Sequence, residues 1–183
     1  MLSIPMITDK SGLPEDRHPE FDNIVEVLHS VRGPFAILMH SPGLAQKVME
    51  AGAHVRLQST LQMKERELTI LAVSREKDAG YEWVAHVDVG RKNGLREEAI
   101  EAVRNRKDVS GLELDERDII TYVRQLLQTN KVEQAVFDSL LERHDVRWLV
   151  ELTATIGQYQ YISAINNAFG VEPKEDAPDK LPV

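Results

Sequence analysis

The chain has 183 residues, a size typical of one domain, with 42% hydrophobic and 28% charged residues. Its formal net charge of −8 argues against a nucleic-acid-binding surface, which needs clustered positive charge. The absence of cysteine excludes disulfides, thiol catalysis, thiolate metal sites and iron–sulfur clusters. No apolar stretch approaches the roughly 20 residues needed to span a bilayer, and Met1–Lys10 lacks the pattern of a signal peptide. These features predict a cytoplasmic globular protein that binds neither nucleic acid nor membrane.

The first part of the chain changes from an irregular arm to helical spacing. Residues 1–17 contain proline and glycine without periodicity, so we expect an arm that lies on the surface or on a neighbouring subunit. From His18 the apolar spacing is helical, and Gly33-Pro34 is expected to end that helix. The run Phe35–Met39 fits a strand or a helix. Ser41-Pro42 then predicts the N-cap and first residue of another helix.

The rest of the chain is also helical in pattern. Asp115 is expected to cap one helix, and Asp145–Phe169 is the longest apolar pattern, in which Gly157 marks a close helix contact or a bend. The other expected helices cover residues 63–75, 81–92, 95–104 and 132–143. Because no run alternates with period two, the sequence predicts an all-α fold of about seven or eight helices. We expect an arm at 1–17, a helical domain at 18–171 and a disordered or draped tail at 172–183.

One helix carries a candidate acid–base couple. Glu82 precedes His86 by four residues, so both side chains share one face of the Tyr81–Lys92 helix, among small and apolar neighbours. Burying charged side chains among apolar residues costs free energy unless they pair with each other, so such a pair suggests a functional use. Histidine titrates near neutrality, and a carboxylate can orient it or relay a proton. We therefore identify Glu82 and His86 as candidate catalytic residues, with Glu67 on the preceding helix as a third member.

Two other interpretations of this pair stay open. A Glu–His pair at this spacing is also common on exposed helices, where it contributes only tenths of a kcal/mol. A metal site would need two more ligands, and the sequence has neither a second Glu-x-x-His pair nor a His-Glu-x-x-His motif. We expect no metal and no other cofactor. The remaining histidines are expected to be structural: His18, His29, His40, His54 and His144.

Three motifs follow one another in the centre of the chain: Glu-Arg-Glu at Glu65–Glu67, Tyr-Glu-Trp-x-x-His at Tyr81–His86 and Gly-Leu-x-x-Glu at Gly94–Glu98. With weaker matches at 40–46 and 156–171, this pattern resembles the carboxymuconolactone decarboxylase family, which includes the alkylhydroperoxidase D group. The resemblance covers about residues 33–171. It implies an all-α, AhpD-like fold that assembles as trimers or hexamers, with the site on the motif helix near a subunit contact.

The peroxidase branch of that family uses a Cys-x-x-Cys pair, with a histidine four residues after the second cysteine and a relay glutamate on the preceding helix. By resemblance, the cysteine positions correspond to Ala79 and Glu82, and the relay glutamate corresponds to Glu67. Both cysteines are therefore missing. Thiol peroxidase and disulfide-reductase chemistry are not available to this chain.

The decarboxylase branch needs no thiol and acts on a carboxylated, unsaturated lactone from aromatic catabolism. The resemblance therefore implies a cofactor-free lyase or isomerase that acts by acid–base chemistry on a cyclic carboxylated small molecule. In this hypothesis His86 donates the proton, Glu82 orients it and Glu67 is the relay. Tyr81 would hydrogen-bond the substrate carbonyl. The candidate partners for a substrate carboxylate are Arg56, Arg66 and Arg91.

A second hypothesis is a non-catalytic, oligomeric helical protein of the same fold, with a ligand-binding or accessory role, which the loss of both cysteines suggests. Self-association is expected in either case. The helix Trp148–Phe169 is apolar on most faces and must be covered on most faces. The trimer or hexamer is implied by the resemblance alone.

Overall fold

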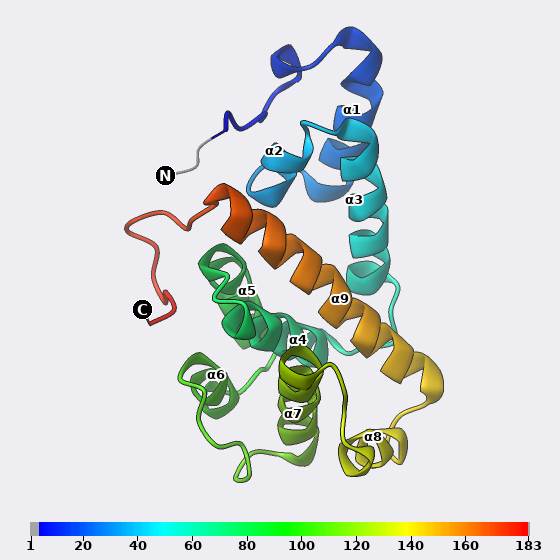
Figure 1. Cartoon of the computed structure of the whole chain (residues 1–183), viewed down its shortest axis with the longest axis vertical. Helices are drawn as coiled ribbons and strands as arrows, with labels where there is room; N and C mark the ends of the chain where they lie inside the picture. Colours follow the sequence, from blue (N-terminus) through cyan, green and yellow to red (C-terminus); the bar gives the residue numbers. More distant parts are fainter. Residues whose placement is uncertain (1–3, 183) are drawn as a thin grey trace.

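The computed structural model describes residues 4–182, and this part of the chain contains nine α-helices and no strand (Figure 1). The prediction of an all-α fold is confirmed, and the short run left open between strand and helix forms the five-residue α2. Two 3-10 helices come first, η1 (Lys10–Gly12) and η2 (Glu15–Arg17). The α-helices are α1 (His18–Leu28), α2 (Pro34–Leu38), α3 (Pro42–Leu57), α4 (Met63–Glu76), α5 (Gly80–Lys92), α6 (Glu97–Arg104), α7 (Leu114–Thr129), α8 (Gln134–Leu141) and α9 (Val146–Phe169).

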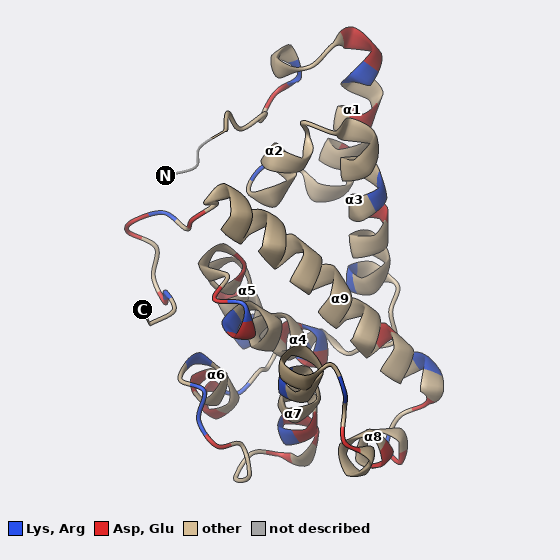
Figure 2. Ribbon diagram, viewed as in Figure 1, with Lys and Arg blue, Asp and Glu red and all other residues tan. Residues whose placement is uncertain are grey.

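Helix α9 lies between two groups of helices, α1–α3 on one side and α4–α8 on the other (Figure 1). Its Leu152 and Ile156 belong to the larger hydrophobic cluster, which the α4–α8 group builds around Trp83. Its Ile162 belongs to the smaller cluster of the α1–α3 group. Helix α9 carries only two charged residues, both near its N-terminus, and is otherwise uncharged (Figure 2). This composition lets one helix be covered from both sides.

Helix α4 is the centre of the larger group and packs against α5, α6, α7 and α9. Nearly every residue from Glu65 to Arg75 is buried, including the charged side chains of Arg66 and Glu67. Its first turn is fixed by a capping box between Gln62 and Glu65. A buried charge needs partners, so the charged residues of α4 must be satisfied inside the fold.

Two local predictions are wrong, and one of the two alternatives for Gly157 is excluded. Helix α1 ends at Leu28, where His29 adopts a left-handed conformation, and Gly33-Pro34 begins α2 instead of ending α1. Asp115 lies in the first turn of α7, whose N-cap is Glu113. A Cβ atom on Gly157 would meet nothing within 4 Å, so this glycine marks no close helix contact.

The two chain ends lie on the helical body. The arm is fastened by a backbone hydrogen bond from Ile7 N to the Ala36 carbonyl (3.0 Å) and by a contact between His40 Nε2 and the Pro5 carbonyl (2.7 Å). The tail drapes along α5 (Figure 1). Of the alternatives for the tail, the structure therefore shows the draped one over the residues that it describes. None of the described helices has the length and hydropathy of a transmembrane segment.

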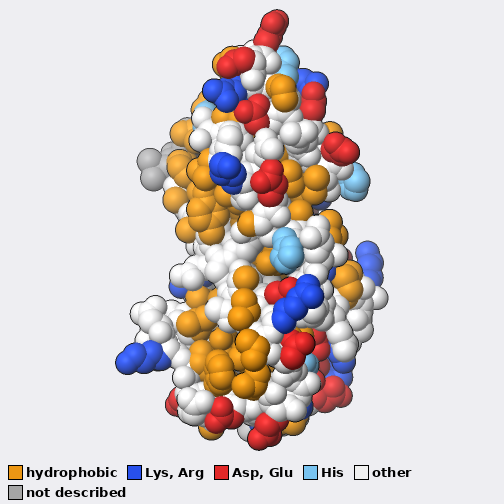
Figure 3. Space-filling model, turned by 90° about the vertical axis from the view of Figure 1, so that its right-hand side faces the viewer, with side chains coloured by type: hydrophobic (Ala, Val, Ile, Leu, Met, Phe, Trp, Pro, Cys, Tyr) orange, Lys and Arg blue, Asp and Glu red, His pale blue; other side chains and the backbone are white. Residues whose placement is uncertain are grey.

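Part of the surface remains apolar. One face shows hydrophobic side chains gathered in its lower half (Figure 3). Val146 and Val150 of α9 are 65% and 60% exposed, and Leu57 at the end of α3 is 71% exposed. Most of α9 is nevertheless covered within one chain, by α2, α3, α4 and α8. The expected self-association remains a prediction.

Candidate active site

His86 and Glu67 form a direct polar contact between α5 and α4. Nδ1 of His86 on α5 lies 2.7 Å from Oε2 of Glu67 on α4. Burial alone would raise the pKa of Glu67, but the hydrogen bond and charge of His86, together with Arg66, outweigh it and hold that pKa below its usual value. An ionised carboxylate only accepts hydrogen bonds, so Nδ1 carries the proton and donates it to Glu67. The other ring nitrogen, Nε2, then carries no proton and can accept one.

Glu82 lies beside that second nitrogen. Its Oε2 is 3.6 Å from His86 Nε2, and its Oε1 accepts a hydrogen bond of 2.9 Å from Asn166 Nδ2 on α9. Glu82 and Asn166 are both buried. The structure thus brings together all three residues predicted as catalytic, with Glu67 in hydrogen-bond contact with the imidazole and Glu82 next to its free nitrogen.

Arg66 is the counter-charge of Glu67. Its Nε and Nη2 each lie 3.2 Å from Glu67 Oε1, and its Nη1 donates to the Arg56 carbonyl. Both side chains of this ion pair are almost fully buried. Arg66 was a candidate for binding a substrate carboxylate, but its donors are used by Glu67 and by the backbone.

A cavity of about 640 Å³ opens at His86. Helix α5 contributes Tyr81, Glu82 and His86 to its wall, and the opposite walls come from the α1–α2 connection, α3, α9 and the tail. Glu67 does not line the cavity, because it lies behind the imidazole ring. The volume is within the range of small-molecule sites.

Two tyrosines flank the histidine in this cavity. The edge of Tyr159 meets the His86 ring at 89°, with 5.2 Å between ring centroids. Tyr81 lines the cavity where Gly33 passes: a Cβ atom on Gly33 would lie 2.5 Å from the Tyr81 ring. Burial raises the pKa of both phenols, although nearby arginines oppose the shift. Both hydroxyls therefore keep their protons at neutral pH and can donate hydrogen bonds to a ligand.

Two arginines line the cavity without a carboxylate partner. Arg32 and Arg56 belong to its wall, and both side chains are exposed. Every other arginine in residues 4–182 is ion-paired. Of the three predicted carboxylate-binding candidates, Arg56 therefore lies at the site, whereas Arg91 is held by acidic residues outside the cavity.

Within residues 4–182, Glu67, Glu82 and His86 do not converge on a single point as metal ligands would. The three-residue group that does so is Glu65, Asp115 and His144. Its members have other partners: Glu65 accepts from Trp148 Nε1 (3.0 Å), Asp115 pairs with Arg143, and His144 stacks on Trp148. Ordinary hydrogen bonding accounts for this group.

The remaining histidines lie outside the cavity, in the described part of the chain. His18 contacts the Leu13 carbonyl, His54 contacts Gln58, and His29 ends α1. Sequence reasoning missed Arg32, Tyr159 and Asn166 as residues of the site. No local spacing reveals them, because each reaches the motif helix from an element distant in the chain.

Comparison with known proteins finds a family match over the part of the chain that carries the site. Residues 42–123 match the model of the Carboxymuconolactone decarboxylase family, a range that contains Glu67, Tyr81, Glu82 and His86. No curated protein matches the sequence.

Solved structures share the fold over almost the whole chain. The alkylhydroperoxidase AhpD core of an uncharacterized peroxidase-related protein from Ralstonia eutropha is 18% identical, with a TM-score of 0.77 over 96% of this chain and 94% of that one. A peroxidase-related protein from Silicibacter is also 18% identical, with a TM-score of 0.72 over 93% and 91%. The debrominase Bmp8, solved as a cysteine-to-alanine variant with 2,3,4-tribromopyrrole, is 14% identical, with a TM-score of 0.69 over 94% and 93%. The family match over residues 42–123 and the shared fold together support a place for the chain in the carboxymuconolactone decarboxylase and AhpD-like superfamily.

Proposed function

We propose that this chain is a cofactor-free lyase or isomerase that acts by acid–base chemistry on a cyclic, carboxylated small molecule. The observation that carries the proposal is the hydrogen bond between His86 Nδ1 and Glu67 Oε2, which leaves Nε2 of this cavity-lining residue without that partner. A carboxylate behind an imidazole fixes its tautomer and stabilises the imidazolium that forms when Nε2 takes a proton. His86 is then the acid–base group and Glu67 orients it.

The same arrangement serves two related reactions. In an isomerisation, Nε2 removes a proton from one carbon and returns it to another. In a decarboxylation, the bond between a ring carbon and the carboxylate carbon breaks, carbon dioxide leaves, and the electron pair of that bond remains on the ring carbon. The imidazolium then delivers a proton to this ring carbon. Solvent restores the proton between turnovers. Glu82, next to Nε2, disfavours a second anion at this point and directs the substrate carboxylate away from it.

The cavity offers separate partners for such a substrate. Arg32 and Arg56 have no carboxylate of their own in the described structure and are suited to a substrate anion. The Tyr81 hydroxyl is suited to a ring carbonyl, where a hydrogen bond would stabilise the charge that develops in the transition state. Apolar side chains such as Phe35, Met49 and Ile162 complete the wall and suit the body of the ring.

A mass-resolved assay tests the proposal. Metal-free protein is incubated with a panel of carboxylated lactones, and loss of carbon dioxide or isomerisation is followed. His86→Gln should abolish turnover, whereas His54→Gln, the same change outside the cavity, should leave it intact. Alkyl hydroperoxide with a dithiol reductant, run in parallel, should give no turnover. Equal rates for wild type and His86→Gln on a verified substrate would refute the assignment of His86.

The alternative is a non-catalytic, oligomeric ligand-binding or accessory protein that uses the same cavity. The partly enclosed space and its unpaired arginines support binding as much as chemistry. Binding of lactones, or of the 2,3,4-tribromopyrrole bound by the debrominase, without turnover in any assay would favour this second function. Titration calorimetry with wild type and an Arg56→Gln variant separates binding from catalysis.

A further inference from the structure

The C-terminal segment forms one wall of the cavity. After α9 ends at Phe169, the chain turns back along α5 toward α6 (Figure 1). Five residues of this segment line the same cavity as His86 and Tyr81: Pro173, Lys174, Asp176, Ala177 and Pro178. This wall of the cavity is therefore an irregular segment, whereas the other walls are helices and the α1–α2 connection.

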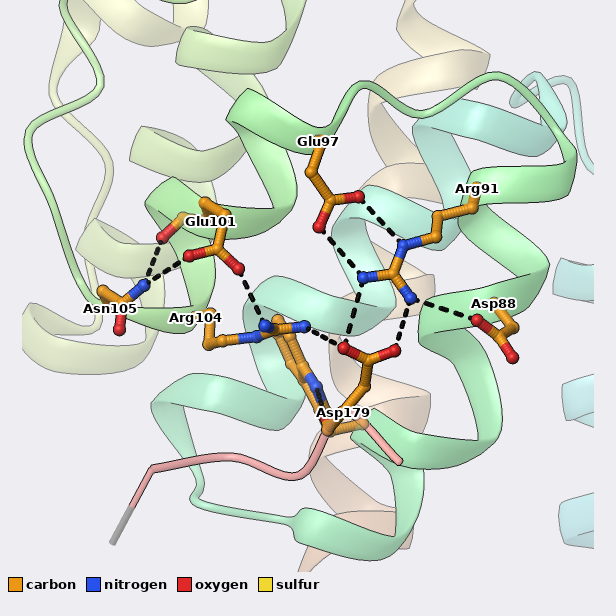
Figure 4. A network of polar contacts seen from close by, with 8 residues as sticks. Asp88, Arg91, Glu97, Glu101, Arg104, Asn105 and Asp179 are labelled. Atoms are coloured by element: carbon orange, nitrogen blue, oxygen red, sulfur yellow. Dashed lines mark hydrogen bonds and ion pairs between the residues drawn. The ribbon is translucent and has the colours of Figure 1, made fainter. Parts of the chain in front are cut away.

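Asp179 fastens the far end of this wall to α5 and α6 (Figure 4). Its carboxylate accepts hydrogen bonds from Arg91 Nη1 (2.6 Å), Arg91 Nη2 (3.3 Å) and Arg104 Nη2 (3.0 Å). Its backbone carbonyl accepts a further bond of 2.8 Å from the indole Nε1 of Trp83. Charge-assisted hydrogen bonds of this kind are about twice as strong as neutral ones.

The contacts of Asp179 with Arg91, Arg104 and Trp83 are called the latch below, and the backbone conformation of Asp179 agrees with such a role. Asp179 adopts a left-handed conformation with φ of 57°, which a non-glycine residue holds only when its surroundings enforce it. Arg91 is itself held in place by Glu97 and Asp88 (Figure 4). The anchor is thus a preformed pair of guanidinium groups that the tail carboxylate enters.

Between its two ends the wall is only loosely attached. At one end Val171 is buried, and at the other Asp179 is fixed. In the described structure, the hydrogen bonds made by residues 172–178 stay within the tail, as between Ala177 N and the Lys174 carbonyl. The attachment of this span to the helices therefore depends on packing and on its ends. A span of this kind opens more easily than a helix.

We propose that residues 172–179 are a movable wall that sets which ligands enter the cavity, and that Asp179 is the positioning residue that holds this wall closed. The inference rests on the proposed use of the cavity as the ligand site, but not on the reaction carried out there. With the wall closed, the cavity admits small ligands; with the latch released, larger ones enter and every ligand exchanges faster.

The first test measures the latch itself. The chain has two tryptophans, so its nuclear magnetic resonance spectrum has two indole N–H signals, of which Trp83 reports the latch and Trp148 serves as the internal reference. In Asp179→Asn, hydrogen exchange at the Trp83 indole should be about tenfold faster than in wild type, because the ion pairs of the carboxylate with Arg91 and Arg104 are lost and only weaker hydrogen bonds to an amide oxygen remain. Exchange at Trp148 should not change. Asp179→Glu, which keeps the charge, should restore at least part of the protection.

The matched control is Glu175→Gln, the same loss of a carboxylate in the same tail. The Glu175 side chain is exposed, makes no contact with Arg91, Arg104 or Trp83 in the described structure, and does not line the cavity. It should leave exchange at Trp83 unchanged. Equal exchange at Trp83 in wild type, Asp179→Asn and Glu175→Gln would overturn the latch.

The second test measures entry into the cavity with two aromatic sulfonate probes of different size, 8-anilinonaphthalene-1-sulfonate and its larger dimer. Asp179→Asn should raise the association rate of the smaller probe about tenfold and the relative affinity for the larger probe by a similar factor. Glu175→Gln should change neither. Ala53→Trp, which fills the cavity from α3, should abolish binding and thereby show that the probes report this site.

The outcomes separate this inference from the proposed function. Faster probe entry in Asp179→Asn supports the movable wall even if no lactone is turned over. Unchanged probe kinetics in Asp179→Asn, with binding still abolished by Ala53→Trp, would refute it even if turnover depends on His86.

Discussion

His86 Nδ1 donates a hydrogen bond of 2.7 Å to Oε2 of Glu67, a residue 19 positions earlier in the chain. The contact joins α4 to α5, the two helices that carry the motifs of the family. It holds one ring nitrogen of His86, a residue that lines the cavity, and leaves the second nitrogen next to Glu82. Four predictions follow from the surroundings of this contact and from the packing of α9 and the α1–α2 connection.

Changing Glu67 to Gln should weaken the tautomer preference of His86. The Glu67 carboxylate only accepts hydrogen bonds, whereas an amide offers both a donor and an acceptor. Nitrogen-15 chemical shifts of the ring should show the proton on Nδ1 in wild type and a mixed population in the variant. A wild-type ring protonated on Nε2 alone would contradict the assignment. On a verified substrate the variant should lose about 10²- to 10⁴-fold in kcat/KM, whereas Glu26→Gln, an exposed change on α1, should lose nothing.

Asn166→Ala should destabilise the protein by about 1–3 kcal/mol. The change removes the donor to Glu82 Oε1 and leaves a buried carboxylate oxygen without this hydrogen bond. Urea unfolding followed by circular dichroism measures the effect. The neighbouring Asn167 is exposed and bonds only to the Lys77 carbonyl, so Asn167→Ala should cost about 1 kcal/mol or less. Equal unfolding free energies for both variants would argue against a structural link between α9 and Glu82.

Two glycines should respond to alanine in opposite directions. Gly33 has a φ of 55°, and a Cβ atom there would collide with the Tyr81 ring, so Gly33→Ala should cost about 1–3 kcal/mol and displace Tyr81 in the cavity. Gly157 lies inside α9 with open space around it, so Gly157→Ala should stabilise the protein by about 0.5–1 kcal/mol. Thermal and urea unfolding of the two variants provide the comparison. A stabilising Gly33→Ala would show that the α1–α2 connection can move away from Tyr81.

Acid should weaken the attachment of α9 through Glu151. Burial raises the pKa of this carboxyl, but hydrogen bonds from the Thr60 backbone and side chain and from Arg147 dominate and lower the pKa to about 2, from an ordinary value of 4.5. Because the folded pKa is the lower one, its stabilising contribution is complete above pH 4.5 and is lost as the pH falls toward 2. Unfolding free energies of wild type and Glu151→Gln, measured from pH 6 down to pH 2.5, should therefore converge at low pH. A constant difference between them would refute this role of Glu151.

The sequence predicted much of this site because its key residues share one helix. The four-residue spacing places Glu82 and His86 on one face of α5, and the structure confirms that neighbourhood. Spacing cannot rank contacts between helices, however, and the hydrogen bond of His86 goes to Glu67 on α4. Arg32 and Asn166 escaped prediction for the same reason, since their positions depend on how α1–α2 and α9 pack.

Helix boundaries that depend on local signals were also predicted better than boundaries that depend on packing. Ser41-Pro42 was predicted as the N-cap and first residue of a helix, and α3 does begin at Pro42 with Ser41 as its N-cap, because proline at the first helical position is a local signal. Gly33-Pro34 was predicted as a helix end and is a helix start. Glycine and proline signal a break in either case, and only the packing of α2 against α9 decides on which side of the break the helix lies.

Helix α9 has a consequence for how the protein is made. It is the last helix of the chain, yet it supplies side chains to both hydrophobic clusters and the Tyr159 and Ile162 walls of the cavity. A nascent chain that has not yet released residues 146–169 from the ribosome lacks the shared surface on which the two groups of helices meet. Apolar faces within the first 145 residues therefore stay uncovered until residues 146–169 have left the ribosome, and the cavity can form only after that.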